Sequence, residues 1–311
     1  NVYRNPASVY QEDHEGAIIA ANDSDNMEFN KDTYSYMWPR DGALVAIALI
    51  KAGFAEDTKK FFTFCKKVLF EEGCLLHKYN PDGSVGSSWH PWVLQGEYSL
   101  PIQEDETALV LHALKVYYDT TKDKRFIKDL YSPLIKPMGE FLAKYRRDSG
   151  LPKESFDLWE ERRGVFTFTT ACTLAGLKAA DELGHVVKDK PFCQLCDVGF
   201  EAIRNAKVKY LYNEELGYFR RSVSFEGGEI VYDDAMDASV FAITEFGVFD
   251  VDDEKVRSTM EKMRQWLGVK TSVGGIARYY NDYYYQQSTE LDVVPGNPWF
   301  ICSCWYAKYL I

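Results

Sequence analysis

The chain has 311 residues and a formal net charge of −11, and it contains 21 Tyr, 19 Phe and 7 Trp. The length suits one large domain or two ordinary ones, and the negative charge argues against nucleic acid or an anionic membrane as partner. No run of about 18 uncharged apolar residues is present, so no transmembrane helix is expected. No signal peptide is recognisable at the start, although an upstream segment before Asn1 stays open.

Helical patterns of two kinds alternate along the chain. One kind is apolar on all sides, which is typical of a helix enclosed by protein, and the other has a single apolar stripe. The enclosed kind is predicted at residues 41–52, 107–118, 166–180, 235–246 and 299–311. The striped kind is predicted at residues 56–70, 123–147, 191–212 and 252–267. Residues 16–21 form a strand-like run, and a hairpin turned at Gly227-Gly228 is expected within residues 218–231.

This alternation predicts an all-α fold. Sequential helices with short connections pack as antiparallel neighbours, so the enclosed helices are expected inside a double ring and the striped helices outside. With residues 1–14 as a further outer helix, about ten helices are present. The common closed form is the (α/α)6 toroid, which has twelve, so we predict a single domain over residues 1–311 that is incomplete at its C-terminal end. An open helical array is the alternative, although no fixed-period repeat is visible.

Polar and aromatic residues precede every enclosed helix. Inner helices of such a ring run in one direction, so their N-termini share a face, where carboxylates are favoured. Helix capping is the alternative for any single segment, but the recurrence in five segments predicts a polar cleft. The residues are Trp38, Arg40 and Asp41; Gln103, Glu104 and Asp105; Trp159, Glu160 and Glu161; Asp233, Asp234 and Asp237; and Arg278, Asn297, Pro298 and Trp299.

The composition of this cleft favours a neutral carbohydrate ligand. Carboxylates accept hydrogen bonds from sugar hydroxyls, and aromatic rings stack on the apolar faces of sugars. Glycoside hydrolysis needs one protonated carboxylic acid and a second carboxylate. The neighbouring charge and the ring of Trp159 are two reasons to expect a raised pKa in the pair Glu160-Glu161. One of the pair is therefore a candidate general acid, and a solvated loop beside a helix N-terminus is the simpler alternative.

Four segments resemble glycoside hydrolase family 15, which contains glucoamylases, glucodextranases and some microbial trehalases. They are residues 34–41 (YSYMWPRD), 157–161 (DLWEE), 275–279 (GIARY) and 296–300 (GNPWF), in the family's order. The resemblance spans residues ~1 to 311 and implies an (α/α)6 barrel that hydrolyses with inversion, in which acid and base are about 6.5–9.5 Å apart.

The resemblance also implies roles for individual residues. Glu160 corresponds to the general acid. The expected substrate-binding residues are Tyr34, Trp38, Arg40, Asp41, Asp105, Trp159, Glu161, Arg278 and Trp299.

The sequence departs from the family at two positions and lacks a domain of some members. The general base is a glutamate between the last two barrel helices, which is expected beyond residue 311, and Glu290 lies in a loop of the wrong order. Fungal members have a tryptophan where Ser99 stands, six residues before Asp105, and Trp89 or Trp92 is a candidate replacement. The N-terminal β-sandwich domain of prokaryotic members is absent from these residues.

The resulting expectation is an inverting exo-acting α-glucoside hydrolase that releases glucose from the non-reducing ends of oligosaccharides or polysaccharides. A trehalase or an isomalto- or dextran-specific enzyme is the alternative within the family. A non-catalytic carbohydrate-binding or regulatory domain is an alternative of another class, because no general base is found. A polysaccharide lyase is disfavoured, because lyases that act on uronates favour basic clefts. The sequence does not indicate an oligomeric state.

The seven cysteines are odd in number and lie mostly in apolar helical runs, so we interpret them as reduced thiols of the core. Reduced thiols favour the cytoplasm, and a secreted form stays open. Cys193-Gln-Leu-Cys196 has the spacing of a redox or zinc motif but lacks a second ligand pair nearby. No loop has the ligand spacing of a calcium site. We therefore expect no metal and no other cofactor.

Overall fold

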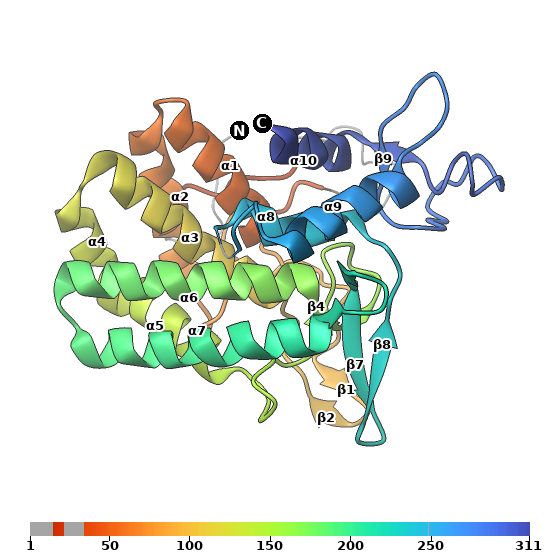
Figure 1. The fold of residues 1–311 in the computed structure, drawn as a ribbon. Coiled ribbons are helices and arrows are strands. Elements are labelled where there is room, and N and C mark those ends of the chain that lie inside the picture. The colour runs from red at the N-terminus through yellow and green to blue at the C-terminus, as the bar shows by residue number, and fades with distance from the viewer. Residues whose placement is uncertain (1–14, 22–33, 248) are drawn as a thin grey trace. The chain divides into compact units, whose positions relative to one another are not determined.

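The computed structural model describes residues 15–21, 34–247 and 249–311. The chain divides into two compact units: Asn1–Arg146 with Thr173–Glu201 (unit 1), and Arg147–Cys172 with Ala202–Ile311 (unit 2). The long helices α6 (Thr167–Val187) and α7 (Lys190–Leu211) each contribute residues to both units (Figure 1). The outer helix expected in residues 1–14 lies outside the described residues.

Unit 1 is built around α3 (Glu104–Thr121), which α1, α2 and α5 contact. The ring of Phe62 on α2 packs against Tyr117 of α3, with centroids 5.9 Å apart. Gly176 on α6 lies so close to α3 that a Cβ there would come within 2.8 Å of the Cα of Ala108. The other elements are α1 (Pro39–Lys51), α2 (Ala55–Val68), β1 (Val93–Leu94), β2 (Glu97–Tyr98), α4 (Lys124–Leu130), the π-helical turn η2 (Tyr131–Ile135) and α5 (Lys136–Lys144).

Unit 2 combines short strands with helices. The turn of the β7–β8 hairpin is at Gly227 and Gly228, as predicted, and their φ angles of 59° and 88° suit glycine. Four strands form a sheet in the order β3-β4-β7-β8. The strands are β3 (Ser155–Phe156), β4 (Arg163–Phe166), β5 (Tyr212–Asn213), β6 (Tyr218–Phe219), β7 (Ser222–Glu226), β8 (Glu229–Asp233), β9 (Ile276–Ala277) and β10 (Pro298–Trp299). The helices are the 3₁₀-helix η3 (Ala238–Phe241), α8 (Ala242–Glu245), α9 (Glu254–Leu267) and α10 (Phe300–Leu310).

The predicted helices agree with the structure in number and place, with three differences. When η2 is joined to α4 and α5, and η3 to α8, nine helical segments lie in the described residues. Residues 235–246 form only η3 and the short α8, and residues 163–166 form β4, so the helix predicted from residue 166 begins at Thr167 as α6. Helix α10 is apolar but not enclosed, since Cys302 is its one buried residue and Phe300 is 94% exposed. Apolar composition alone did not distinguish a covered helix from an exposed one.

All seven cysteines lie in the described residues without a disulfide, six of them buried and Cys304 exposed. No helix in the described parts of the chain has both the length and the apolar character needed to cross a bilayer.

Lys207 on α7 is a titratable side chain that is buried without an ion-pair partner among the described residues. The residue is fully buried, and its Nζ has no hydrogen-bond partner in the described structure. Its nearest aromatic neighbour is Phe249, whose ring centroid lies 4.3 Å from Nζ. Burial lowers the pKa of Lys207 to about 7, from 10.5. The pKa of Lys207 is lower in the folded state than in the unfolded state. Its buried charge therefore lowers the stability of the fold by the full amount below pH 7, and this stability is regained as the pH rises from 7 to 10.5.

We expect Lys207→Met to raise the free energy of unfolding at pH 7 by about 2 to 4 kcal/mol, since each pKa unit corresponds to about 1.4 kcal/mol. The substitution should also remove the stability gain of the parent between pH 7 and pH 10. Chemical denaturation at several pH values measures both effects. Lys209→Met, an exposed neighbour on the same helix, serves as the matched control. An unchanged stability and pH slope in Lys207→Met would show that Lys207 carries no buried charge.

Candidate active site

Glu160 lies at the tip of a turn between β3 and β4. The turn is closed by hydrogen bonds from the Asp157 N–H to the Arg162 carbonyl (2.9 Å) and from the Glu160 N–H to the Asp157 carbonyl (2.9 Å). Glu160 has a φ of 62°, in the left-handed region that a non-glycine residue seldom adopts. Such conformations cost free energy and cluster at functional sites. Glu160 was expected next to the start of a helix, but β4 separates it from α6.

The carboxylate of Asp157 holds this turn in place. Its Oδ1 accepts hydrogen bonds from the N–H groups of Glu161 (2.7 Å) and Arg162 (3.0 Å). Asp157 is only 2% exposed, and burial raises its pKa to about 6 against the opposing effect of these two donors. The backbone conformation of Glu160 is therefore set by a buried side chain three residues earlier.

Both carboxylate oxygens of Glu161 are engaged. Oε1 pairs with Nη2 of Arg278 at 3.0 Å, and Oε2 accepts from the Tyr279 hydroxyl at 2.6 Å and from Nη1 of Arg162 at 2.8 Å. Two guanidinium groups thus compensate the charge of Glu161. These two arginines therefore offset the repulsion expected between the carboxylates of Glu160 and Glu161.

Arg278 is held by a buried carboxylate and flanked by rings. Its Nε and Nη2 donate to the two oxygens of Asp282 at 2.7 and 2.8 Å, and Asp282 is fully buried. The guanidinium carbon lies 5.2 Å from the Trp159 ring, 4.9 Å from Tyr284 and 5.0 Å from Trp299. Nη1 donates to no side chain among the described residues. The arrangement fixes the guanidinium plane and leaves one donor group for a ligand.

Trp159 is fixed by a hydrogen bond of its own. Its Nε1 donates to the carboxylate of Asp237, 3.1 Å from each oxygen. Asp237 also caps η3 by accepting from the Ser239 N–H at 2.8 Å, so the capping alternative holds for this residue. Burial raises the pKa of Asp237 above its usual value.

In unit 1, Arg40 belongs to a buried polar cluster at the start of α1 and α3. Its Nη1 contacts Oε1 of Gln103 (2.7 Å), Oδ2 of Asp105 (2.9 Å) and Oε1 of Glu106 (3.2 Å). Asp105 is fully buried, whereas the side chain of Asp41 is 51% exposed, with Oδ2 3.5 Å from Nε of Arg40. Burial raises the pKa of Glu106 well above its usual value, and Arg40 opposes this shift. Of these acids, Asp41 is the one that a ligand could reach.

Aromatic residues gather beside this cluster in unit 1. The rings of Tyr34 and Trp38 are stacked, with centroids 6.0 Å apart, and Trp38 donates to Nε2 of His77 at 3.2 Å. Nζ of Lys78, only 2% exposed, lies 3.6 Å from the ring centroid of the half-exposed Trp89. The aromatic pair Tyr34 and Trp38 was predicted, but the buried Lys78 was not.

The structure thus groups the predicted residues within each unit. Unit 2 brings together Trp159, Glu161, Arg278 and Trp299 beside the turn at Glu160, and unit 1 brings together Tyr34, Trp38, Arg40, Asp41 and Asp105. Glu290 is exposed and has no contact with these residues in the described structure. Sequence reasoning missed the supporting residues Lys78, Glu106, Asp157, Tyr279 and Asp282. Signals were available for three of them, since Asp157 and Tyr279 lie in the segments that resemble the family, and Asp282 follows Arg278 by four residues.

The family model described as "Glycosyl hydrolases family 15" matches residues 1–89 and 93–311. Among curated relatives, an uncharacterized glycosyl hydrolase of Methanocaldococcus jannaschii is 31% identical over 96% of the chain and 42% of its own length. A glucoamylase of a Clostridium species is 27% identical over 86% of the chain and 37% of its own length. Trehalase 2 of Sulfolobus acidocaldarius is 23% identical over 95% of the chain and 50% of its own length. The chain thus spans half or less of the length of these relatives.

Solved structures show the same fold. A bacterial glucoamylase complexed with acarbose matches with a TM-score of 0.66 and 23% identity, over 89% of the chain and 40% of its own. This similarity confirms the predicted fold class, the all-α (α/α)6 toroid.

Proposed function

The chain belongs to glycosyl hydrolases family 15, and from this we propose an inverting, exo-acting α-glucoside hydrolase that releases glucose from non-reducing ends. The observation that carries the proposal is the turn at Glu160. Glu160 has a left-handed backbone conformation, and the next residue, Glu161, is fixed by two arginines. A backbone conformation that costs free energy fits a catalytic acid, because the position of its carboxyl group is what the reaction requires. A glucoamylase among the relatives supports the choice of substrate.

In this proposal, Glu160 protonates the oxygen of the leaving sugar. Arg278 donates from Nη1 to a hydroxyl of the terminal glucose, with Glu161 and Asp282 fixing its orientation. The rings of Trp159 and Trp299 stack against apolar sugar surfaces, as protein rings do at carbohydrate sites.

Residues of unit 1 are also proposed to bind substrate. Asp41 accepts from sugar hydroxyls because its carboxylate is half exposed. Tyr34 and Trp38 supply stacked rings. Arg40 and Asp105 are buried, so they act mainly by orienting Asp41 and the start of α1.

The second carboxylate is proposed to come from outside these 311 residues. Inversion needs a base that activates water and whose carboxyl group lies about 6.5–9.5 Å from that of the acid. Glu290 is exposed and lies in a loop of the wrong order for this role. The relatives are about twice as long as the chain. Helix α10 exposes Phe300, Ile301 and Leu310, which further helices of one catalytic domain would cover. Intact mass above 35.8 kDa for the protein from its natural source supports this, and equality with 35.8 kDa contradicts it.

The test is product analysis with maltose, maltotriose, isomaltose and trehalose, using the full-length protein from its natural source. We expect glucose from the maltose series, and proton NMR should detect the β-anomer first, because inversion at an α-linkage gives β-glucose. Acarbose, the ligand of the similar glucoamylase structure, should inhibit competitively. The α-anomer as first product would refute inversion. Acarbose binding without hydrolysis of any of the four would indicate a non-catalytic binding protein.

Trehalose hydrolysis is the second candidate function. The similarity to Trehalase 2 favours it, since that protein aligns with 95% of the chain. A kcat/KM for trehalose above that for maltose would decide in its favour.

A further inference from the structure

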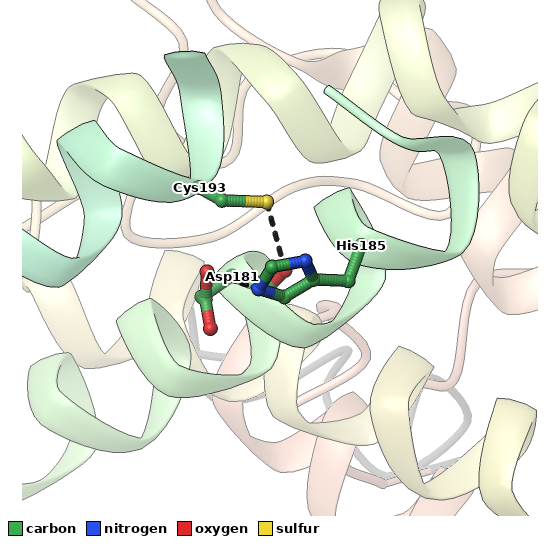
Figure 2. A group of neighbouring side chains, drawn as sticks. All are labelled: Asp181, His185 and Cys193. Atoms are coloured by element: carbon green, nitrogen blue, oxygen red, sulfur yellow. Dashed lines mark hydrogen bonds and ion pairs between the residues drawn. The ribbon is translucent and has the colours of Figure 1, made fainter. Parts of the chain in front are cut away.

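Three metal-ligating side chains meet where α6 turns into α7, within unit 1. Asp181 and His185 are one helical turn apart on α6, and Cys193 is on the first turn of α7 (Figure 2). Nε2 of His185 lies 3.4 Å from Oδ1 of Asp181, and Sγ of Cys193 lies 3.4 Å from the backbone oxygen of Asp181. One ligand atom from each residue lies within 4.8 Å of the other two. The cluster therefore needs only a small adjustment to surround an ion.

The donor set selects a class of metal. A carboxylate, an imidazole and a thiolate together suit a borderline transition-metal ion, and zinc accepts all three. Zinc–ligand bonds of about 2.0–2.3 Å in a tetrahedron place ligand atoms about 3.3–3.8 Å apart. The Asp181–His185 separation already falls in that range. Rotation about the side-chain bonds of the exposed His185 would bring the remaining atoms closer.

Access and charge also fit a cation. The His185 side chain is 67% exposed and that of Asp181 30%, so an ion can enter from solvent and keep a water as its fourth ligand. Asp197 and Glu182 add negative charge near Asp181. A coordinating cation deprotonates a thiol.

We propose that Asp181, His185 and Cys193 bind one divalent transition-metal ion, with zinc as the preferred ion, and that this site joins α6 to α7. On binding, the Cys193 sulfur forms a bond to the metal, and its proton passes to solvent. The sequence suggested a Cys193–Cys196 pair and then argued against a metal. In the structure, the neighbours of Cys193 in the cluster are His185 and Asp181, which are 8 and 12 residues earlier in the sequence, and not Cys196. This spacing matches no familiar metal-binding motif. None of the three residues is among those proposed for catalysis or substrate binding.

Metal titration of the full-length protein, prepared without a histidine tag and treated with EDTA, tests the proposal. We expect one equivalent of Zn²⁺ by calorimetry. Co²⁺ alone should give a thiolate-to-cobalt charge-transfer band, a signature that a carboxylate or imidazole site lacks. Zn²⁺ should raise the melting temperature, because a ligand that binds only the folded state stabilises it.

Substitutions separate this site from adventitious binding. His185→Ala changes an exposed residue and should fold normally, yet lower zinc affinity at least tenfold. Cys193→Ser should abolish the charge-transfer band. Cys304→Ser removes the exposed cysteine and should leave affinity and band unchanged. Absence of the band in the parent, unchanged affinity in His185→Ala, or loss of the band in Cys304→Ser would each overturn the assignment.

Discussion

Glu160→Gln is expected to lower kcat by about 100- to 10,000-fold, the usual contribution of general acid catalysis, with little change in KM. The carboxamide keeps the shape of the side chain but cannot protonate the leaving oxygen. The measurement is the initial rate of glucose release from maltotriose by a full-length parent and its variant. Near-normal turnover in Glu160→Gln would show that another group is the acid.

A substrate with a good leaving group distinguishes loss of the acid from damage to the site. Fluoride departs from α-glucosyl fluoride with little need of a proton, so Glu160→Gln should lose far less activity on this substrate than on maltotriose. Equal losses on both would mean that Glu160 positions the substrate and does not donate the proton. Glu160→Gly is the folding control. Glycine adopts a φ of 62° without strain, so this variant should be as stable as the parent or more stable by up to about 1 kcal/mol, although inactive.

Arg278→Met is expected to lower the free energy of unfolding by about 3 to 5 kcal/mol, the usual cost of removing one partner from a buried ion pair. The loss would leave Asp282 fully buried and without its two hydrogen bonds from the guanidinium. It would also free Oε1 of Glu161 and remove the donor proposed for the terminal glucose. Denaturation by urea and the KM for maltose report the two effects separately.

The double variant Arg278→Met/Asp282→Asn shows how much of the stability loss comes from leaving the Asp282 carboxylate buried without its ion-pair partner. Asparagine at position 282 can still accept from the Tyr284 N–H, and it has no charge to strand. We expect it to recover at least half of the stability that Arg278→Met loses, while KM stays raised. Arg264→Met on the exposed face of α9 is the matched control and should change neither quantity. A stability loss in the double variant equal to that in Arg278→Met would contradict the ion-pair explanation.

The helices were largely predictable from the sequence, because the buried side chains of a helix recur with the period of the helix. The stripe of α2 and the turn at Gly227-Gly228 depend on local patterns, and both are where they were expected. The exposure of α10 in these 311 residues does not follow from its own apolar pattern, since whether a helix is covered depends on neighbours far away in sequence.

The sequence singled out the candidate site residues but not the side chains that hold them in place. Trp159, Glu161 and Arg278 belong to recognisable segments. Two of the fixing contacts, from Trp159 to Asp237 and from Arg278 to Glu161, join residues that are 78 or more positions apart. The left-handed backbone of Glu160 was not predictable either, because glutamate carries no signal for it and the buried Asp157 imposes it.

The positive φ of Glu160 has a consequence for how this position evolves. Substitution by glycine or asparagine would make the folded protein easier to form, so selection for abundance alone would remove the glutamate. Given its proposed role as general acid, selection for activity would retain it. Among natural variants of this chain, we therefore expect glutamate at position 160 in lineages that use the site, and glycine or asparagine in lineages released from it.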